Sequence, residues 1–189
     1  MAVEIEAKMK VSDLESVREK LTTLGAAKVG EFFEINTFFD TEDRSLLAAD
    51  HGLRLRAARN LVDNTQTFRY TFKGARQHGV LKSREEIELD VGDHRTAERF
   101  LLALGFQKVL SFEKRRHTWK LEGCSVELDE LPHLGVYVEI EGTDEQTILR
   151  IRDQLGLQKA PLIKTSYVAM LMGYLQDNGT HTRSVTFGS

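Results

Sequence analysis

Charged and apolar residues alternate along several short stretches of the chain. In residues 3–10, the sequence VEIEAKMK places a charged residue at every even position and an apolar residue at every odd one. A period of two is that of a β-strand with one apolar and one charged face. Similar patterns predict eight strands in all. These are residues 3–10, 32–40, 53–57, 67–74, 84–89, 112–119, 125–129 and 136–141.

Helical patterns separate some of these strands. Ser12 and Glu15 have the spacing of a capping box, which predicts that a helix begins there. Apolar residues at helical spacing follow, and Gly25 stands where a glycine ends a helix. Further helices are predicted over residues 46–49, 144–155 and 162–176. Residues 75–82 form a polar loop.

The first strand–helix–strand pattern recurs later in the chain. Eight residues between Val11 and Phe32 are repeated eighty positions later, between Val91 and Phe112. Two copies at this spacing are too few for a solenoid and predict two pseudo-symmetric halves of one domain. We expect residues 1–177 to form this domain. The short, polar and glycine-containing residues 178–189 predict a disordered tail.

Composition narrows the class of protein. The chain has 189 residues, 41% of them hydrophobic and 29% charged, which is ordinary for a soluble globular protein. The net charge is −3, and lysines and arginines alternate with acids, so no nucleic-acid partner is expected. No apolar run is long enough to span a bilayer, so no membrane partner is expected. Cys124 is the single cysteine, which excludes an intramolecular disulfide and favours a cytoplasmic location.

The charged strand faces are sorted by sign. Their residues are mostly Glu, Asp, Lys and Arg, and they come in pairs of like charge: Glu4 with Glu6, Arg54 with Arg56, Glu86 with Glu88, Lys114 with Arg116, and Glu139 with Glu141. An ordinary α+β domain with one solvated sheet face would mix in Ser, Thr, Asn and Gln. A closed eight-stranded antiparallel β-barrel with these charges inside and helices packed outside explains the sorting better. Such burial is costly unless the charges pair with each other or with a charged ligand.

The sorted charges predict a class of ligand. Clustered Arg and Lys suit an oligophosphate, because Arg offers bidentate hydrogen bonds and Lys a point charge. Clustered carboxylates suit Mg²⁺ or Mn²⁺, which prefer oxygen ligands. The combination is typical of phosphoryl or nucleotidyl transfer. The chain has no glycine-rich phosphate loop, and its six histidines show no zinc-like spacing.

An ordered set of motifs resembles a known superfamily. The set comprises Glu4-x-Glu6-x-Lys8, Leu53-Arg54-Leu55-Arg56, Lys73-Gly74, Arg84-x-Glu86-x-Glu88, Lys114-x-Arg116, Asp129, Leu134-Gly135 and Glu139-x-Glu141. It spans residues 3–175 and resembles the CYTH superfamily, the triphosphate tunnel metalloenzymes. Within it, residues 71–74 and Lys164-Thr165-Ser166-Tyr167 are similar to the class IV adenylyl cyclase branch. Ala75 departs from that branch, which often has proline there.

The resemblance implies roles for individual residues. The metal ligands would be Glu4, Glu6, Asp129, Glu139 and Glu141. The triphosphate would be bound by Arg54, Arg56, Lys73, Arg84, Lys114 and Arg116. Lys8 would lie beside the reacting phosphate, so Lys8 and Glu6 are the catalytic candidates. Glu86 and Glu88 would complete the tunnel wall with Arg84, where a purely structural ion-pair role is the alternative.

The resemblance also implies an activity. The leading expectation is a Mg²⁺- or Mn²⁺-dependent adenylyl cyclase that converts ATP to cyclic AMP and pyrophosphate. The alternative is a triphosphatase acting on tripolyphosphate, thiamine triphosphate or a nucleoside triphosphate, and a third interpretation is a non-catalytic binder of polyphosphate or nucleotide. A homodimer is expected from the family alone.

Overall fold

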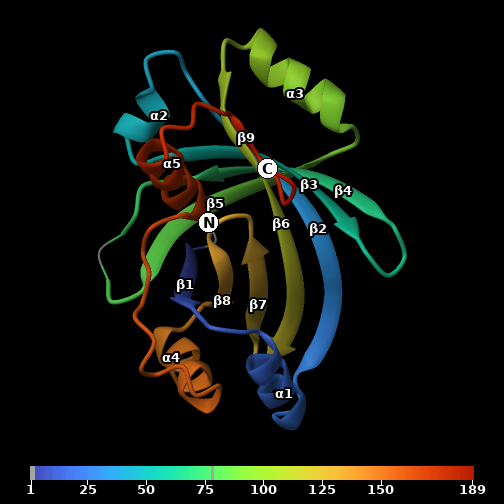
Figure 1. Cartoon of the computed structure of the whole chain (residues 1–189), viewed down its shortest axis with the longest axis vertical. Coiled ribbons are helices and arrows are strands. Elements are labelled where there is room, and N and C mark those ends of the chain that lie inside the picture. The colour runs from blue at the N-terminus through green and yellow to red at the C-terminus, as the bar shows by residue number, and fades with distance from the viewer. Residues whose placement is uncertain (1–2, 78) are drawn as a thin grey trace.

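Eight antiparallel strands form a closed barrel in the computed structural model, which describes residues 3–77 and 79–189 (Figure 1). The strands are β1 (Val3–Lys10), β2 (Ala27–Asp40), β3 (Gly52–Asn60), β4 (Gln66–Lys73), β5 (Lys82–Val91), β6 (Gln107–Leu121), β7 (Cys124–Leu131) and β8 (Gly135–Gly142). Their order is β2-β3-β4-β5-β1-β8-β7-β6, and β6 pairs back with β2. The predicted fold is confirmed.

The alternation in the sequence separates the inside of the barrel from its outside. In the β1–β8 pair, Glu6 lies opposite Glu141 and Lys8 opposite Glu139. Residues directly opposite each other in a ladder share one face of the sheet. These charged side chains therefore lie together inside the barrel, whereas Met9 points outward into an apolar core.

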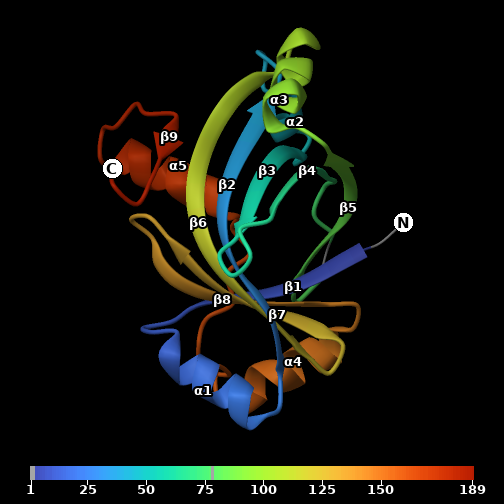
Figure 2. The same ribbon diagram turned by 90° about the vertical axis from the view of Figure 1, so that its right-hand side faces the viewer.

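Helices cover parts of the apolar outer surface (Figure 2). The helix α1 (Glu15–Thr23) and the helix α4 (Glu145–Gln154) pack below the barrel in a core that contains Leu21 and Ile148. The helix α3 (His94–Ala103) packs over β3 in a core that contains Leu101 of the helix and Leu55 of the strand. The short helix α2 (Ser45–Ala48) precedes β3. In residues 3–77 and 79–189, no helix combines the length and apolar composition needed to cross a bilayer.

The last long helix, α5 (Tyr167–Asp177), packs against one end of the barrel. Its Leu171 is fully buried in a separate core with Leu110 and Phe112 of β6. Phe112 also lines the interior cavity together with Tyr167. The helix α5 therefore joins an apolar core directly to the charged interior.

The internal repeat is visible in the fold. The elements β1-α1-β2 and β5-α3-β6 follow each other in the same order, and β2 and β6 begin eighty residues apart. The helix-ending glycines Gly25 and Gly105 have φ angles of +73° and +92°, which favour glycine because it lacks a Cβ. The prediction of two related halves is confirmed by this shared element order.

Several element boundaries differ from the prediction. The N-cap residue of α1 is Leu14 rather than Ser12, and the carboxylate of Asp13 accepts the Ser16 N–H at 2.9 Å. The helix α5 begins at Tyr167 rather than at residue 162, because Ser166 is its extended N-cap residue. The strands β2 and β6 are longer than predicted, with 14 and 15 residues.

The C-terminal residues 178–189 are not the disordered tail that the sequence predicts. They contain a short strand, β9 (Ser184–Val185), which pairs in parallel with Ser111 and Phe112 of β6. The β6–β7 ladder covers β6 only from Arg115 onward, so β9 satisfies backbone groups beyond it. Val185 is 1% exposed in the core under α5. A two-residue strand in a polar segment carries too little pattern to be predicted.

The packing of this tail predicts that Val185→Asp destabilises the protein. An aspartate would place an unpaired carboxylate in the α5 core, and we expect a loss of about 1–3 kcal/mol in the free energy of unfolding. Val62→Asp is the control, because Val62 is 75% exposed. Urea denaturation measures both. Equal stability of the two variants would show that the tail does not dock.

Candidate active site

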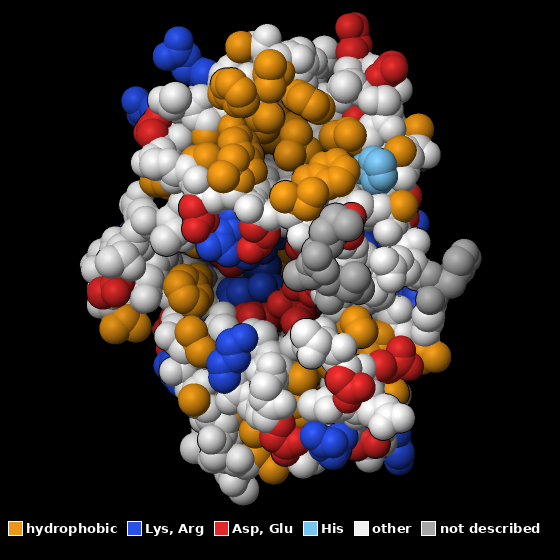
Figure 3. Space-filling view, turned by 180° about the vertical axis from the view of Figure 1, so that it is seen from behind, with side chains coloured by type: hydrophobic (Ala, Val, Ile, Leu, Met, Phe, Trp, Pro, Cys, Tyr) orange, Lys and Arg blue, Asp and Glu red, His pale blue; other side chains and the backbone are white. Residues whose placement is uncertain are grey.

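A cavity of about 930 Å³ occupies the inside of the barrel. Seen from behind, it opens as a hollow whose depths are filled with Lys, Arg, Asp and Glu side chains (Figure 3). Most of the predicted site residues line it: Glu4, Glu6, Lys8, Arg54, Arg56, Lys73, Arg84, Glu86, Glu88, Lys114, Arg116, Glu139 and Glu141. The fold thus brings residues from six strands to one site.

Asp129 is the predicted site residue that does not line this cavity. It is 0% exposed, and Arg116 donates to both of its carboxylate oxygens, at 2.7 and 2.6 Å. Lys114 Nζ lies 3.4 Å from Oδ2 of Asp129. A bidentate pair of this kind fixes the orientation of an arginine. In this structure Asp129 therefore holds two of the predicted phosphate-binding cations in place.

Lys8 lies between two carboxylates in the middle of the tunnel. Its Nζ is 3.3 Å from Glu6 Oε1 and 3.2 Å from Glu139 Oε1. Burial lowers the pKa of Lys8, but the charges of Glu139 and Glu6 outweigh burial and raise it above its ordinary value. Burial likewise opposes ionisation of Glu139, but Lys8 and Arg116 hold its pKa well below the usual range. Both groups are therefore charged at neutral pH.

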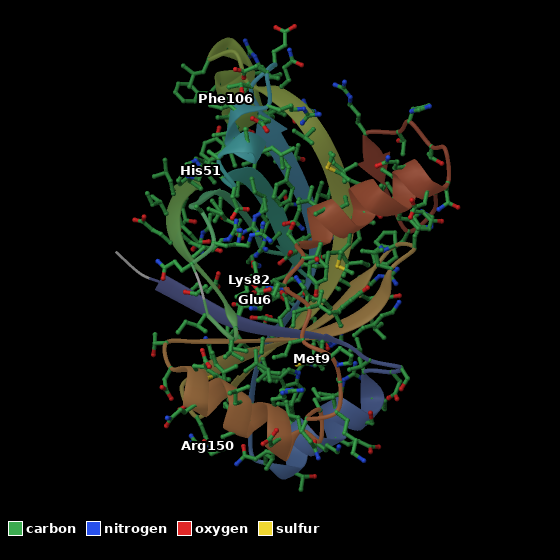
Figure 4. All side chains as sticks on the ribbon, turned by 90° about the vertical axis from the view of Figure 1, so that its left-hand side faces the viewer. Glu6, Met9, His51, Lys82, Phe106 and Arg150 are labelled. Atoms are coloured by element: carbon green, nitrogen blue, oxygen red, sulfur yellow. The ribbon has the colours of Figure 1, made fainter. Side chains whose placement is uncertain are left out.

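Lys82 is a tunnel residue that the sequence analysis misses. Its Nζ lies 2.6 Å from Glu6 Oε2, and the two side chains meet inside the barrel (Figure 4). The sequence pattern assigns Lys82 to the polar loop, whereas the structure makes it the first residue of β5. Its alternation with Arg84 and Glu86 is the signal that could have found it.

Strand β2 supplies two further residues that the sequence analysis misses, Glu34 and Asn36. Glu34 is 2% exposed, and its Oε2 lies 3.2 Å from Lys114 Nζ and 3.3 Å from Arg56 Nε. Asn36 accepts a hydrogen bond from Arg56 Nε at 3.0 Å. Both are even-numbered positions of a predicted strand, but a single acid and an amide do not form a like-charged pair. The criterion of like-charged pairs therefore does not select them.

The phosphate-binding candidates keep unused hydrogen-bond donors. The Nε atoms of Arg54 and Arg84 are buried and have no hydrogen-bond partner among the described residues. Burial, with the neighbouring charge of Arg56, lowers the pKa of Arg54 to about 10. Buried donors in native proteins are nearly always paired. These guanidinium groups therefore favour an anionic ligand in the cavity.

Two acids at another part of the tunnel have few cationic contacts among the described residues. Glu141 makes no ion pair within 4.0 Å in the described part of the chain, and Glu4 only reaches Lys73 at 4.0 Å. Burial, with the charge of Glu141, raises the pKa of Glu4 to about 9. Burial, with the charge of Glu139, raises the pKa of Glu141 to about 7. Carboxylates in this condition are stabilised by a hard divalent cation, so the residues present fit Mg²⁺ or Mn²⁺.

The acids are not already arranged around a metal position. Within residues 3–77 and 79–189, no three His, Cys, Asp or Glu side chains converge closely enough to hold an ion. Glu86 is also paired, because its carboxylate accepts a short hydrogen bond from Lys73. Metal binding would therefore require side-chain rotation of the tunnel acids.

Comparison with known proteins identifies the family. The CYTH domain family matches residues 2–167. The chain belongs to the CYTH family. This confirms the resemblance inferred from the ordered motifs of charged residues.

Relatives of this CYTH protein align with most of the chain. It is 28% identical over 177 residues to a Methanocaldococcus jannaschii protein named as a proposed adenylate cyclase. That alignment covers 89% of this chain and 98% of the relative. A Pyrococcus horikoshii structure has the same fold, with a TM-score of 0.79, 23% identity and coverage of 90% and 99%. A Hippeastrum structure has a TM-score of 0.65, 18% identity and coverage of 96% and 98%, and is described as having dominant triphosphatase activity.

The ion pairs of Glu34 predict an acid-sensitive contribution to stability. Burial alone would raise the pKa of Glu34, but Arg56 and Lys114 hold it well below its ordinary value. Because the folded pKa lies below the unfolded one, the stabilisation is present at neutral pH and is lost as pH falls below about 4.3. We expect Glu34→Gln to lower the free energy of unfolding by about 3 kcal/mol at pH 7.

The difference in the free energy of unfolding between the wild type and Glu34→Gln should shrink by about 1.4 kcal/mol per pH unit below pH 4. Urea denaturation at pH 7, 4 and 3 measures it, with the exposed Glu42→Gln as control. A difference that stays constant over this range would contradict the assignment of Glu34 as an ionised partner.

Proposed function

We propose that this protein is a divalent-metal-dependent enzyme that acts on a triphosphate inside the tunnel, and that its reaction is the conversion of ATP to cyclic AMP and pyrophosphate. One observation carries the proposal. The same cavity is lined by Arg54 and Arg84, whose buried Nε atoms have no hydrogen-bond partner among the described residues, and by two half-buried carboxylates. Of these, Glu4 has a lysine no nearer than 4.0 Å, and Glu141 has no ion pair within 4.0 Å in the described part of the chain. A phosphate chain and a metal ion together satisfy both sets.

The cationic side of the tunnel would bind the phosphates. Arg54, Arg56 and Arg84 offer guanidinium groups, and Lys73 and Lys114 offer ammonium groups. Arg116 is oriented by Asp129 and by Glu139, whose Oε2 lies 2.6 Å from Arg116 Nη2. Preorganised cations of this kind stabilise charge that develops in the transition state.

The acidic side would hold Mg²⁺ or Mn²⁺. The candidate ligands are Glu4, Glu6, Glu139 and Glu141, and Asp129 would first have to release Arg116. When bound, such an ion neutralises phosphate charge and polarises the reacting phosphoryl group. Glu86 and Glu88 lie on the wall formed by β5, where Glu88 pairs with Arg69 at 2.8 Å and Glu86 with Lys73.

Lys8 would act through its charge. Because Glu139 and Glu6 keep it protonated despite burial, Lys8 is an ammonium ion and not a general base. In the cyclase reaction the oxygen of the ribose 3′ hydroxyl attacks the α-phosphorus, the hydroxyl proton passes to solvent water, and the bond between the α-phosphorus and the bridging oxygen breaks so that pyrophosphate leaves. An ammonium group beside that phosphorus stabilises the charge on the phosphoryl oxygens.

A triphosphatase is the second candidate function. Water would attack the γ-phosphorus, and the same cationic side chains would bind the phosphate groups. The two reactions therefore differ in which phosphorus the nucleophile attacks. The name of the M. jannaschii relative favours the cyclase, whereas the description of the Hippeastrum protein favours the triphosphatase. A homodimer and a cytoplasmic location stay predictions from the sequence and the family.

Turnover of ATP tests the proposal. With ATP and Mn²⁺ or Mg²⁺, we expect cyclic AMP and pyrophosphate, separated by chromatography. Arg56→Gln should lower kcat/KM by about 100-fold, because it removes a charged donor to the phosphates. Arg59→Gln is the matched control, since Arg59 lies on the same strand but faces outward and is exposed.

Each product pattern has a defined meaning. ADP or free phosphate without a cyclic product would replace the cyclase by the triphosphatase, to be followed with tripolyphosphate and thiamine triphosphate. No product from any of these substrates, together with measurable ATP binding, would favour the non-catalytic binder.

Metal binding gives a test independent of turnover. Glu141→Gln removes a carboxylate oxygen from a side chain that makes no ion pair within 4.0 Å among the described residues, and we expect Mn²⁺ affinity to fall by about tenfold or more. Isothermal titration with Mn²⁺ measures it. The control is Glu130→Gln, because Glu130 lies on the outer side of β7 and pairs with Arg115 at 3.1 Å. Equal affinity of both variants would remove Glu141 from the ligand set.

A further inference from the structure

Tyr167 brings an aromatic ring from α5 into the charged tunnel. It is the first residue of the helix, is 8% exposed, and lies on the border between the α5 core and the cavity. In the sequence, residues 164–167 stand out only as a resemblance to one branch, and the functions assigned to the tunnel leave Tyr167 without a role.

The ring lies against two buried lysines. The Nζ of Lys8 is 4.2 Å from the centre of the Tyr167 ring, and the Nζ of Lys114 is 5.7 Å from it. Both lysines are at most 2% exposed. An ammonium ion over an aromatic face is attracted by the ring quadrupole, and the attraction is larger when the groups are removed from water.

The backbone holds the same two segments together. The N–H of Ile163 donates to the carbonyl oxygen of Lys8 at 2.8 Å. The ring of Tyr167 also contacts the ring of Tyr137 edge-on, with centres 5.3 Å apart. The segment that leads into α5 therefore contacts Lys8 through both its backbone and the ring of Tyr167.

The ring differs from the other close partners of Lys8. These partners are Glu6 and Glu139, and both are candidates for metal binding. A metal ion that binds the oxygens of Glu6 and Glu139 would weaken their ion pairs with Lys8. An aromatic face has no oxygen that binds the metal, so its contact with Lys8 would remain. The Tyr167 ring is thus the contact that can keep the Lys8 ammonium in place when the acids serve a metal.

We propose that Tyr167 is a positioning residue, and that its ring holds the Lys8 ammonium in the tunnel beside the phosphate chain. The role assigned to Lys8 rests on the proposed function. The ring carries this role and not the hydroxyl group, because it is the aromatic face that lies against the Nζ atoms of Lys8 and Lys114. The phenylalanine variant should therefore behave like the wild type.

Two substitutions distinguish the effect of the aromatic ring of Tyr167 from the effect of its apolar volume. Tyr167→Phe keeps the aromatic face, and Tyr167→Leu keeps an apolar side chain without it. We expect Tyr167→Phe to retain kcat within about threefold, and Tyr167→Leu to lower kcat by about tenfold with little change in KM. Tyr174→Leu is the control on the same helix, because Tyr174 stacks on His133 instead. Urea denaturation of each variant checks that it is folded, and Tyr167→Met replaces the leucine variant if that one is not.

A second measurement does not depend on turnover. The methylene protons of Lys8 should show a ring-current shift in NMR spectra of lysine-labelled protein, assigned by its loss in Lys8→Arg. The shift should persist in Tyr167→Phe and disappear in Tyr167→Leu. If it persists in the leucine variant, or if both variants lose activity equally, the proposal is wrong. Absence of any turnover in the wild type would refute the proposed function, and the NMR result would still decide the placement of Lys8.

Discussion

The burial of charge inside a closed barrel is the constraint on which the rest of this structure depends. Lys8, Lys114, Glu34, Asp129 and Glu139 are each at most 5% exposed. An isolated charge in such a place is very costly, so each one requires a partner of opposite sign or a ligand. The sorting of charges by strand meets this requirement only in part. Glu34 and Asp129 neutralise Lys114 and Arg116, whereas Arg54, Arg84, Glu4 and Glu141 depend on what enters the cavity.

The same constraint explains the outside of the barrel. When every second side chain points into the tunnel, the intervening apolar side chains point outward and need cover. The helices α1 and α4 provide it below the barrel, and α3 provides it over β3. The pairing of β2 with β6 is the longest ladder and closes the barrel, so the two strands that the internal repeat relates are also the ones that meet. The two copies of the repeated unit thus close the barrel through their own last strands.

Much of the fold and of the site could be predicted because a period of two assigns each residue of a strand to a face. The alternation alone places Glu4, Arg54 and Glu139 in one interior. It fails where the signal depends on something other than pairs of like charge. Glu34 stands alone between apolar residues, Lys82 lies at a strand boundary, and Tyr167 reaches the tunnel only through the packing of α5. The alternation also places Asp129 on the correct face, but it carries no sign that Arg116 occupies both of its oxygens.

The helix α5 connects the stability of the fold with the geometry of the site. Its core contains Leu110, Leu171 and Val185, and the same core includes Tyr167, whose ring lies against Lys8. The effect of a charged group on a reaction depends on its exact position, because a misplacement of about 1 Å can cost about 100-fold in rate. The position of Lys8 along the tunnel therefore depends on apolar packing outside it, and on a C-terminal strand of two residues that helps to close that core. The apolar core under α5 therefore contributes to the position of Lys8 in the charged interior.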